Sequence, residues 1–268
     1  MLTGATGGLG KVILLQAVKN GHRVMMVNRS LEKTINLLSE FEVKKYKSLI
    51  NFFIADFSSQ DWIDNLGDEI KKKDFWPSAL INNAGTNTPL GNTWEIDIDQ
   101  WKHHFNINFF TPVSLISLLI PYFILNKSGA IINLSGGGAT KPMPYFSPYA
   151  ASKTALVRLT ENIAIELKDL NISANAIAPG FLATNIHNDS ISESSKIPNT
   201  IRSNILEEYK AGGKDPNNAA TLILKLIENK NFRFSGNLLS AIWDTVDDKL
   251  LDIETLAINR FKIRRVEK

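Results

Sequence analysis

Near the start of the chain stands the stretch Thr3-Gly4-Ala5-Thr6-Gly7-Gly8-Leu9-Gly10, which joins a short apolar segment to an amphipathic one. Glycines let a backbone turn tightly and approach another group closely. The helix expected after the turn would direct its free N–H groups towards an anion. At a strand–helix junction such a turn binds the pyrophosphate of a dinucleotide, although a glycine loop can also be only a tight turn. A phosphate loop of the Walker A type is excluded, because Ala5 and Val12 depart from its pattern.

Strand-like and helix-like patterns alternate along the rest of the chain. This order predicts an α/β protein: a single-domain Rossmann fold over residues 1–244, with a doubly wound parallel sheet and helices on both faces. Expected strands cover 22–27, 49–54, 79–81, 130–134, 172–177 and 238–242, and expected helices cover 9–20, 31–40, 62–72, 99–125, 149–167 and 219–227. The polar stretch 185–217 predicts a mobile lid or a pair of short helices over a site. Residues 245–268 predict an appended amphipathic helix.

The first strand is unusually short, because only three residues precede Gly4. A phosphate-binding turn normally follows a full strand. We therefore expect that residues are missing upstream of Met1, the alternative being a short central strand.

Composition narrows the classes of protein that the chain can represent. Its 268 residues are 44% hydrophobic and 21% charged, which is typical of a soluble globular protein. The chain has no cysteine, which excludes disulfides and thiol chemistry and suits a cytoplasmic location. A net charge of +3 is too small to indicate nucleic-acid binding. The apolar stretch 109–125 is interrupted by prolines and hydroxyl residues, so we expect a buried or interface helix rather than a membrane span.

The stretch Tyr149-Ala150-Ala151-Ser152-Lys153 places a phenol and an ammonium four residues apart. On a helix such residues lie on the same face and address the same small volume. A phenol has a pKa of about 10, and a nearby ammonium stabilises the phenolate and lowers that pKa. The spacing therefore predicts an acid–base pair, the alternative being an exposed aromatic ring beside a solvated lysine.

The end of the second expected strand reads Val27-Asn28-Arg29-Ser30. An acidic residue at this place would accept a hydrogen bond from the ribose of NAD. Here there is none, and the guanidinium of Arg29 suits a phosphate group. We predict NADP (NADPH) as the cofactor in preference to NAD, although Arg29 could also be an ordinary surface arginine.

Together these motifs resemble the short-chain dehydrogenase/reductase family, over residues 4 to about 243. The segment Asn82-Asn83-Ala84-Gly85 and Asn108 fall in the family's order and spacing, as do Asp56, Pro179-Gly180 and Thr184. The resemblance implies hydride exchange between a nicotinamide and a carbonyl/alcohol substrate. It implies Tyr149 as the acid/base, Lys153 as the group that tunes its pKa, and Asn108 in the proton relay. The cofactor-binding residues that it implies are Gly4, Thr6, Gly8, Leu9, Gly10, Asn28, Arg29, Ser30, Asp56, Phe57, Asn83, Ala84, Gly85, Tyr149, Lys153, Pro179, Gly180 and Thr184.

One position departs from the family pattern. Counting back from Tyr149, the serine that orients substrate should stand where this chain has Gly136. Ser135 lies one residue earlier and would face the other way along a regular strand. Three glycines in a row can bend the loop, so we keep Ser135 as a candidate catalytic residue. Without the serine, a catalytically weak NADP-binding sensor or scaffold is the alternative function.

Further expectations concern the substrate, the assembly and metals. The glycine run and the ending around Trp243 resemble a bacterial subgroup associated with polysaccharide biosynthesis, which suggests a sugar or nucleotide-sugar substrate. A nucleotide-sugar epimerase or dehydratase is a third option, but such proteins usually carry a different glycine spacing and a longer second domain, and this chain has neither. We expect a homodimer or homotetramer that pairs through the 109–125 helix and the Tyr149 helix. No metal spacing is present, and His103 and His104 are expected on a helix surface. Candidate substrate contacts are Thr140, Tyr145, Phe146 and His187.

Overall fold

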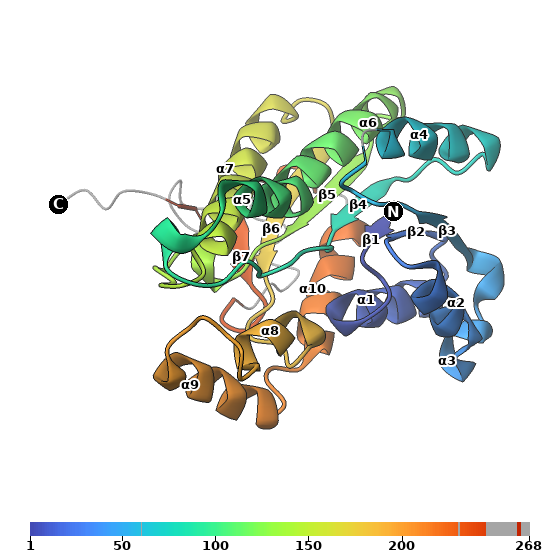
Figure 1. Ribbon diagram of the computed structural model, residues 1–268. Helices are drawn as coiled ribbons and strands as arrows, with labels where there is room; N and C mark the ends of the chain where they lie inside the picture. The colour runs from blue at the N-terminus through green and yellow to red at the C-terminus, as the bar shows by residue number, and fades with distance from the viewer. Residues whose placement is uncertain (60, 230, 245–261, 264–268) are drawn as a thin grey trace.

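A computed structural model describes residues 1–59, 61–229, 231–244 and 262–263 (Figure 1). Seven parallel strands form one sheet in the order β3-β2-β1-β4-β5-β6-β7. This order reverses direction at β1 and β4, as in a doubly wound dinucleotide-binding sheet, and confirms the predicted fold. The strands are β1 (Leu2–Thr3), β2 (Val24–Asn28), β3 (Ile50–Ile54), β4 (Ala79–Asn82), β5 (Gly129–Leu134), β6 (Ile172–Ala178) and β7 (Leu238–Ser240).

Helices cover both faces of the sheet because strand side chains alternate between two apolar faces. Met26 on β2 packs with α1 and α10, whereas its neighbours Met25 and Val27 pack on the opposite face with α4 and α6. A strand buried on both faces reads as a nearly continuous apolar run, which is the pattern of β2 and β5 apart from Asn28 and Asn133. The main helices are α1 (Gly8–Lys19), α2 (Leu31–Ser39), α3 (Phe41–Lys44), α4 (Trp62–Lys72), α5 (Ile98–Phe105), α6 (Thr111–Leu125), α7 (Ser147–Glu166) and α10 (Pro216–Glu228).

The helix predicted over 99–125 is continuous from Ile98 to Leu125, but its middle is wound differently. The segment η3 (Asn106–Phe110) is π-helical and joins α5 to α6. Pro112 stands directly after this segment, as the second residue of α6. The whole helix is long and apolar enough to cross a membrane by length and composition alone. Its inner face is buried against the sheet through residues such as Leu115 and Leu119.

The predicted lid consists of short helices, namely η5 (Asn185–His187), α8 (Asn188–Ile191) and α9 (Asn199–Lys210). A bridge between Leu182 and Gly213 closes its base. The buried Asn87 side chain donates to Ser190 Oγ at 3.0 Å and fastens α8 to the loop after β4. The segment is thus helical, with α9 twelve residues long, and its role as a lid over the site stays a prediction.

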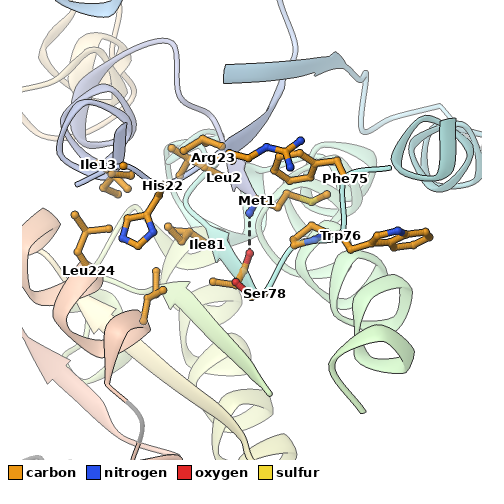
Figure 2. A pocket seen from close by; sticks show the side chains of 16 residues that line it. Met1, Leu2, Ile13, His22, Arg23, Phe75, Trp76, Ser78, Ile81 and Leu224 are labelled. Atoms are coloured by element: carbon orange, nitrogen blue, oxygen red, sulfur yellow. Dashed lines mark hydrogen bonds between the residues drawn. The ribbon is translucent and has the colours of Figure 1, made fainter. Parts of the chain in front are cut away.

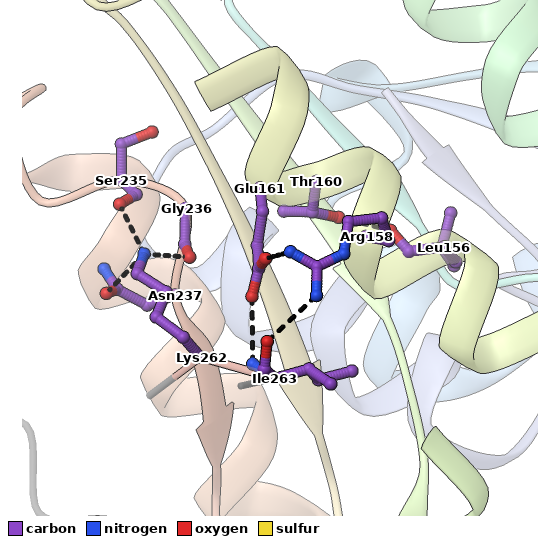
Figure 3. A network of polar contacts seen from close by, with 9 residues as sticks. All are labelled: Leu156, Arg158, Thr160, Glu161, Ser235, Gly236, Asn237, Lys262 and Ile263. Atoms are coloured by element: carbon purple, nitrogen blue, oxygen red, sulfur yellow. Dashed lines mark hydrogen bonds and ion pairs between the residues drawn. The ribbon is translucent and has the colours of Figure 1, made fainter. Parts of the chain in front are cut away.

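The predicted C-terminal helix falls on residues outside the described part of the chain, apart from residues 262 and 263. These two residues lie against α7 and the segment before β7 (Figure 3). The Ile263 N–H donates to Glu161 Oε1 at 3.0 Å, and Glu161 also pairs with Arg158. The Lys262 ammonium donates to the carbonyl of Gly236.

A pocket opens at the amino-terminal edge of the sheet, beside the starts of β1, β2 and β4 (Figure 2). Its wall includes Met1, Arg23 and Trp76. Ligands of open parallel sheets bind instead at the carboxyl ends of the strands. The sequence-predicted site residues lie at that opposite edge.

Candidate active site

The turn between β1 and α1 has a shape that only glycine permits at key positions. A Cβ on Gly10 would overlap the carbonyl oxygen of Gly4, so α1 packs directly on the turn. Gly4 and Gly8 have φ angles of +68° and +52°, which side-chain-bearing residues rarely adopt. Gly7 precedes α1 without any side-chain cap, so the first N–H groups of the helix are available to an anion. The turn therefore fits the pyrophosphate of a dinucleotide.

Side chains from neighbouring strands hold this turn in place. Thr3 Oγ1 accepts from the backbone N–H groups of Asn83 and Ala84 at 3.0 and 2.9 Å. The Asn83 amide donates back to the carbonyls of Thr3 and Gly4. Asn28 is predicted to contact cofactor, but its side chain is 1% exposed and accepts from the Ala5 N–H at 2.8 Å. Its side chain supports the turn from behind instead of facing a ligand.

The residues expected around the adenosine end lie after β2 and β3. Arg29 is exposed and is close enough for its charge to help lower the pKa of Asp56. The larger cause of that lowered pKa is Ser58, whose hydroxyl and backbone N–H both donate to the Asp56 carboxylate. Ser30 is occupied as the N-cap of α2. Phe57 packs on a neighbouring tryptophan ring.

The remaining cofactor candidates adjoin the turn from the lid side. A Cβ on Gly8 would lie 3.0 Å from Thr184 Cγ2, so the turn and the start of the lid are in contact. Thr6, Pro179 and Thr184 are half-buried, Gly180 is exposed, and Leu9 is buried in the core below the turn. The predicted cofactor residues therefore follow the carboxyl edge of the sheet.

Tyr149 and Lys153 lie on the first turns of α7, with Lys153 Nζ 5.9 Å from the centre of the Tyr149 ring. The lysine is 5% exposed, and its ammonium donates to the Leu134 carbonyl at 2.7 Å. Burial raises the pKa of Tyr149 to about 12 and lowers the pKa of Lys153 to about 8. Burial therefore acts on the tyrosine pKa in the direction opposite to the lowering that the sequence predicts, and the tuning of that pKa by Lys153 stays a prediction.

The buried lysine predicts a stability that rises with pH. Between pH 8 and 10.5 the unfolded chain holds a proton on Lys153 that the folded chain has released, so unfolding becomes harder as pH increases. From pH 7.5 to 9.5 we expect this group to contribute a gain of roughly 2 kcal/mol in the free energy of unfolding. Urea titrations of wild type and Lys153→Met at both pH values would measure it. If the free energy of unfolding rises between pH 7.5 and 9.5 no more in wild type than in Lys153→Met, the prediction is contradicted.

Asn108 lies in the π-helical segment and is completely buried. Its Oδ1 accepts from the Thr86 N–H at 2.9 Å, and its Nδ2 donates to the Thr86 carbonyl at 2.8 Å. A Cβ on Gly85 would lie 3.2 Å from Asn108 Oδ1 and 3.5 Å from Lys153 Nζ, so both atoms border the same point. The structure thus brings Asn108 to the Tyr149–Lys153 pair; its role in a proton relay stays a prediction.

The expectation that His104 lies on a helix surface is wrong. His104 is completely buried one helical turn before Asn108, whereas His103 is exposed. Its Nδ1 lies 2.6 Å from the Thr88 carbonyl, and its Nε2 lies 2.9 Å from Asn108 Nδ2. A signal is available in the sequence, because positions 104 and 108 are four residues apart on one helical face.

Gly136 lies directly beneath the Tyr149 hydroxyl. A Cβ at position 136 would overlap Tyr149 Oη and lie 3.1 Å from Cζ. The family has a serine at this position. Here the Tyr149 hydroxyl occupies the space that a side chain at position 136 would need. Ser135 is 4% exposed, and its hydroxyl has no hydrogen-bond partner among the described residues.

An apolar cluster borders Tyr149 on the lid side. It is built from the loop before α7, the loop after β4 and the lid. The predicted contacts Tyr145 and Phe146 belong to it, whereas Thr140 is exposed and His187 stacks on Phe181 at 4.2 Å. The members are Leu90, Met143, Tyr145, Phe146, Tyr149, Ile197, Ile201 and Ile205.

A dinucleotide turn and a tyrosine–lysine pair on one sheet edge, with the lysine buried, define an oxidoreductase of the Rossmann class. The family model for short chain dehydrogenases matches residues 1–195, and the chain belongs to that family. It is 27% identical over 241 residues to the 3-oxoacyl-[acyl-carrier-protein] reductase FabG of Thermotoga maritima, covering 89% of this chain and 94% of that protein. It is 31% identical over 189 residues to the benzil reductase of Bacillus subtilis, covering 69% of this chain and 74% of that protein. The solved structure of ElxO with NADP bound has a TM-score of 0.75 at 26% identity, over 90% of this chain and 95% of that chain.

Proposed function

We propose that this protein is an NADP-dependent oxidoreductase that exchanges hydride between NADP and a carbonyl/alcohol substrate. When bound, the dinucleotide supplies the hydride acceptor or donor of the reaction. The chain's own residues would hold it along the carboxyl edge of the sheet, from Arg29 through the glycine turn to Thr184. The observation that carries the proposal is the convergence of Tyr149, Lys153 and Asn108 beside this turn.

Tyr149 would donate a proton to the substrate oxygen during reduction. With a pKa of about 12 its hydroxyl stays protonated at neutral pH, as a general acid requires. Lys153 has a pKa of about 8 and carries a positive charge at pH 7, close to the oxygen that would lose the proton. These two protonation states suit the donation of a proton from Tyr149 to a carbonyl oxygen at neutral pH.

The surroundings of Tyr149 favour a substrate with an apolar substituent. The neighbouring cluster contains Leu90, Phe146 and Ile197, each less than a tenth exposed, together with lid residues of α9. Apolar walls bind ligands by removing apolar area from water. This supports an apolar ketone or aldehyde more than the sugar-related substrate that the sequence subgroup suggests.

The test is an assay of purified protein with NADPH against apolar ketones, aldehydes and ketosugars, following loss of NADPH absorbance. Turnover of an apolar carbonyl is the expected result. Binding of NADPH without turnover of any compound would favour the sensor or scaffold role, which the missing serine at position 136 motivates. Turnover of ketosugars alone would contradict the proposed substrate preference.

Replacing Arg29 by alanine is expected to weaken NADPH binding and leave NADH binding unchanged. The guanidinium can form charge-assisted hydrogen bonds to a phosphate, and losing them raises the Kd by about 10-fold or more. Fluorescence titrations with both cofactors would measure the change. Arg23→Ala is the matched control, because Arg23 is also exposed but lies over Phe75 at the opposite edge of the sheet. Equal weakening of NADPH and NADH binding by Arg29→Ala would contradict the assignment.

The helix faces expected to pair two copies also carry exposed apolar side chains. Phe110 directly before α6 and Leu125 at its end are 53% and 79% exposed, and Ile165 on α7 is 74% exposed. Large apolar side chains exposed on neighbouring elements are typical of interaction surfaces. They support the proposal of a homo-oligomer, which light scattering of the purified protein would test.

A further inference from the structure

A buried polar cluster lies behind the Tyr149–Lys153 pair and includes a histidine that the proposed reaction does not use. His104 on α5 faces Asn108 on the π-helical segment and Ser152 on α7. All three side chains are completely buried. Buried polar groups need partners, so the hydrogens of this cluster can be assigned from its geometry.

The orientation of the Asn108 amide is fixed first. The Thr86 N–H needs an acceptor and the Thr86 carbonyl needs a donor, so Oδ1 faces the former and Nδ2 the latter. This places the amide oxygen on the side of Gly85, where the Lys153 ammonium also lies. The second N–H of Nδ2 is left to point towards His104.

The tautomer of His104 follows from that assignment. Its Nε2 must accept from Asn108 at 2.9 Å, so this nitrogen carries a lone pair. The proton is then on Nδ1, where it is donated to the Thr88 carbonyl at 2.6 Å. In the opposite tautomer the unprotonated Nδ1 would face the Thr88 carbonyl oxygen, so two acceptors would lie 2.6 Å apart with no hydrogen between them. Burial also lowers the pKa of His104 to about 4, with a smaller effect from the charge of Lys153, which is consistent with a neutral ring.

Ser152 extends this arrangement to the start of α7. Its Oγ lies 3.0 Å from His104 Nε2 and 2.9 Å from the Tyr149 carbonyl, and the hydroxyl can donate to either acceptor. The imidazole therefore connects the loop after β4, the Asn108 segment and the turn of α7 that carries Tyr149. Two of these segments carry Asn108 and Tyr149, and the third carries Gly85, which borders Asn108 and Lys153.

We propose that His104 is a positioning residue of the active site: its neutral, Nδ1-protonated imidazole holds the Asn108 amide in the orientation that Thr86 sets, with the oxygen towards Lys153, and fastens the Tyr149 turn through Ser152. The inference rests on the proposed function for its catalytic purpose. The hydrogen-bonding state that it assigns to His104 does not depend on which substrate the protein reduces.

The first test is the tautomer itself, measured by NMR on protein with 15N-labelled histidine. The chain has four histidines, so the His104 signals are identified by their loss in the His104→Gln variant. A neutral ring protonated at Nδ1 that persists at pH 5.5 is the expected result. A ring protonated at Nε2, or one that titrates like a solvent-exposed histidine, would overturn the inference even if the protein reduces carbonyls as proposed.

The second test uses two variants to distinguish a positioning role of His104 from a purely structural one. Glutamine places an acceptor near the position of Nε2, whereas asparagine retains a donor near Nδ1 only. We expect His104→Gln to keep kcat within about threefold and His104→Asn to lower it roughly tenfold or more, with KM and the NADPH Kd changed less than about twofold. Equal kcat values for the two variants, or a KM that changes as much as kcat, would overturn the inference. If wild type reduces no carbonyl, the proposed function fails. The NMR measurement then still tests the hydrogen-bonding state that is assigned to His104.

Discussion

Replacing Tyr149 by phenylalanine is expected to lower kcat for carbonyl reduction by roughly 10²–10⁴-fold, which is the contribution of a positioned general acid. The change removes one oxygen atom and leaves the ring in the apolar cluster beside Phe146. The fold should persist, because the contacts that hold Tyr149 in this cluster are made by its ring. NADPH oxidation with an apolar ketone, followed at pH 7, would measure the loss.

Tyr122→Phe is the matched control for this experiment. The Tyr122 ring on α6 packs on Trp76 at 4.0 Å, and Trp76 lines the pocket at the opposite, amino-terminal edge of the sheet. Loss of its hydroxyl should leave kcat within about threefold, because this phenol lies away from the proposed site. Wild-type turnover in Tyr149→Phe, with normal NADPH binding in both variants, would remove Tyr149 from the acid–base role.

The succession of elements can be predicted because it depends on local patterns. Ser30 indicates where α2 begins, because its side chain accepts from the Lys33 N–H and caps the helix. The bounds of α4 coincide with the prediction, because a strongly amphipathic stretch ends at a run of lysines. The π-helical segment at Asn106–Phe110 cannot be predicted in the same way, since propensity does not distinguish it from an ordinary helix.

The site can be predicted where a motif specifies a residue type, and it is missed where a contact depends on tertiary structure. His104 is polar and has a second histidine before it, so a surface position is the reasonable expectation. Its burial depends on Thr88 and Ser152, which are 16 and 48 residues away. Asn28 illustrates the same limit, since only the folded chain shows its amide behind the glycine turn.

The directions of the two pKa shifts also require the structure. The sequence places an ammonium near a phenol, which taken alone lowers the pKa of the phenol. In the folded chain Lys153 directs its ammonium to the Leu134 carbonyl, and burial dominates for both groups. The consequence is a tyrosine that remains a proton donor at neutral pH and a lysine that loses its charge near pH 8.

Replacing Gly136 by alanine is expected to lower kcat at least about a hundredfold, although the change adds only a methyl group. The new Cβ would occupy the position of Tyr149 Oη, so the hydroxyl must move away from the point at which it would meet substrate. Misplacing a reacting group by about 1 Å costs on the order of 10²-fold in rate. The fold should survive, because Gly136 has an extended backbone with φ of −173° and the displaced atom is the end of a side chain.

Gly137→Ala provides the control, since a Cβ on this exposed glycine would have no atom of the described residues within 4 Å. Its kcat should stay within about twofold, which would show that the glycine run tolerates a methyl group wherever Tyr149 is not above it. Serine, which the family has at position 136, gives the decisive comparison. If the chain has merely lost a useful serine at this position, Gly136→Ser would raise kcat above wild type. If the Tyr149 hydroxyl instead occupies the space of the side chain at position 136, Gly136→Ser displaces this hydroxyl as Gly136→Ala does. We then expect kcat to fall in both variants while NADPH binding is retained.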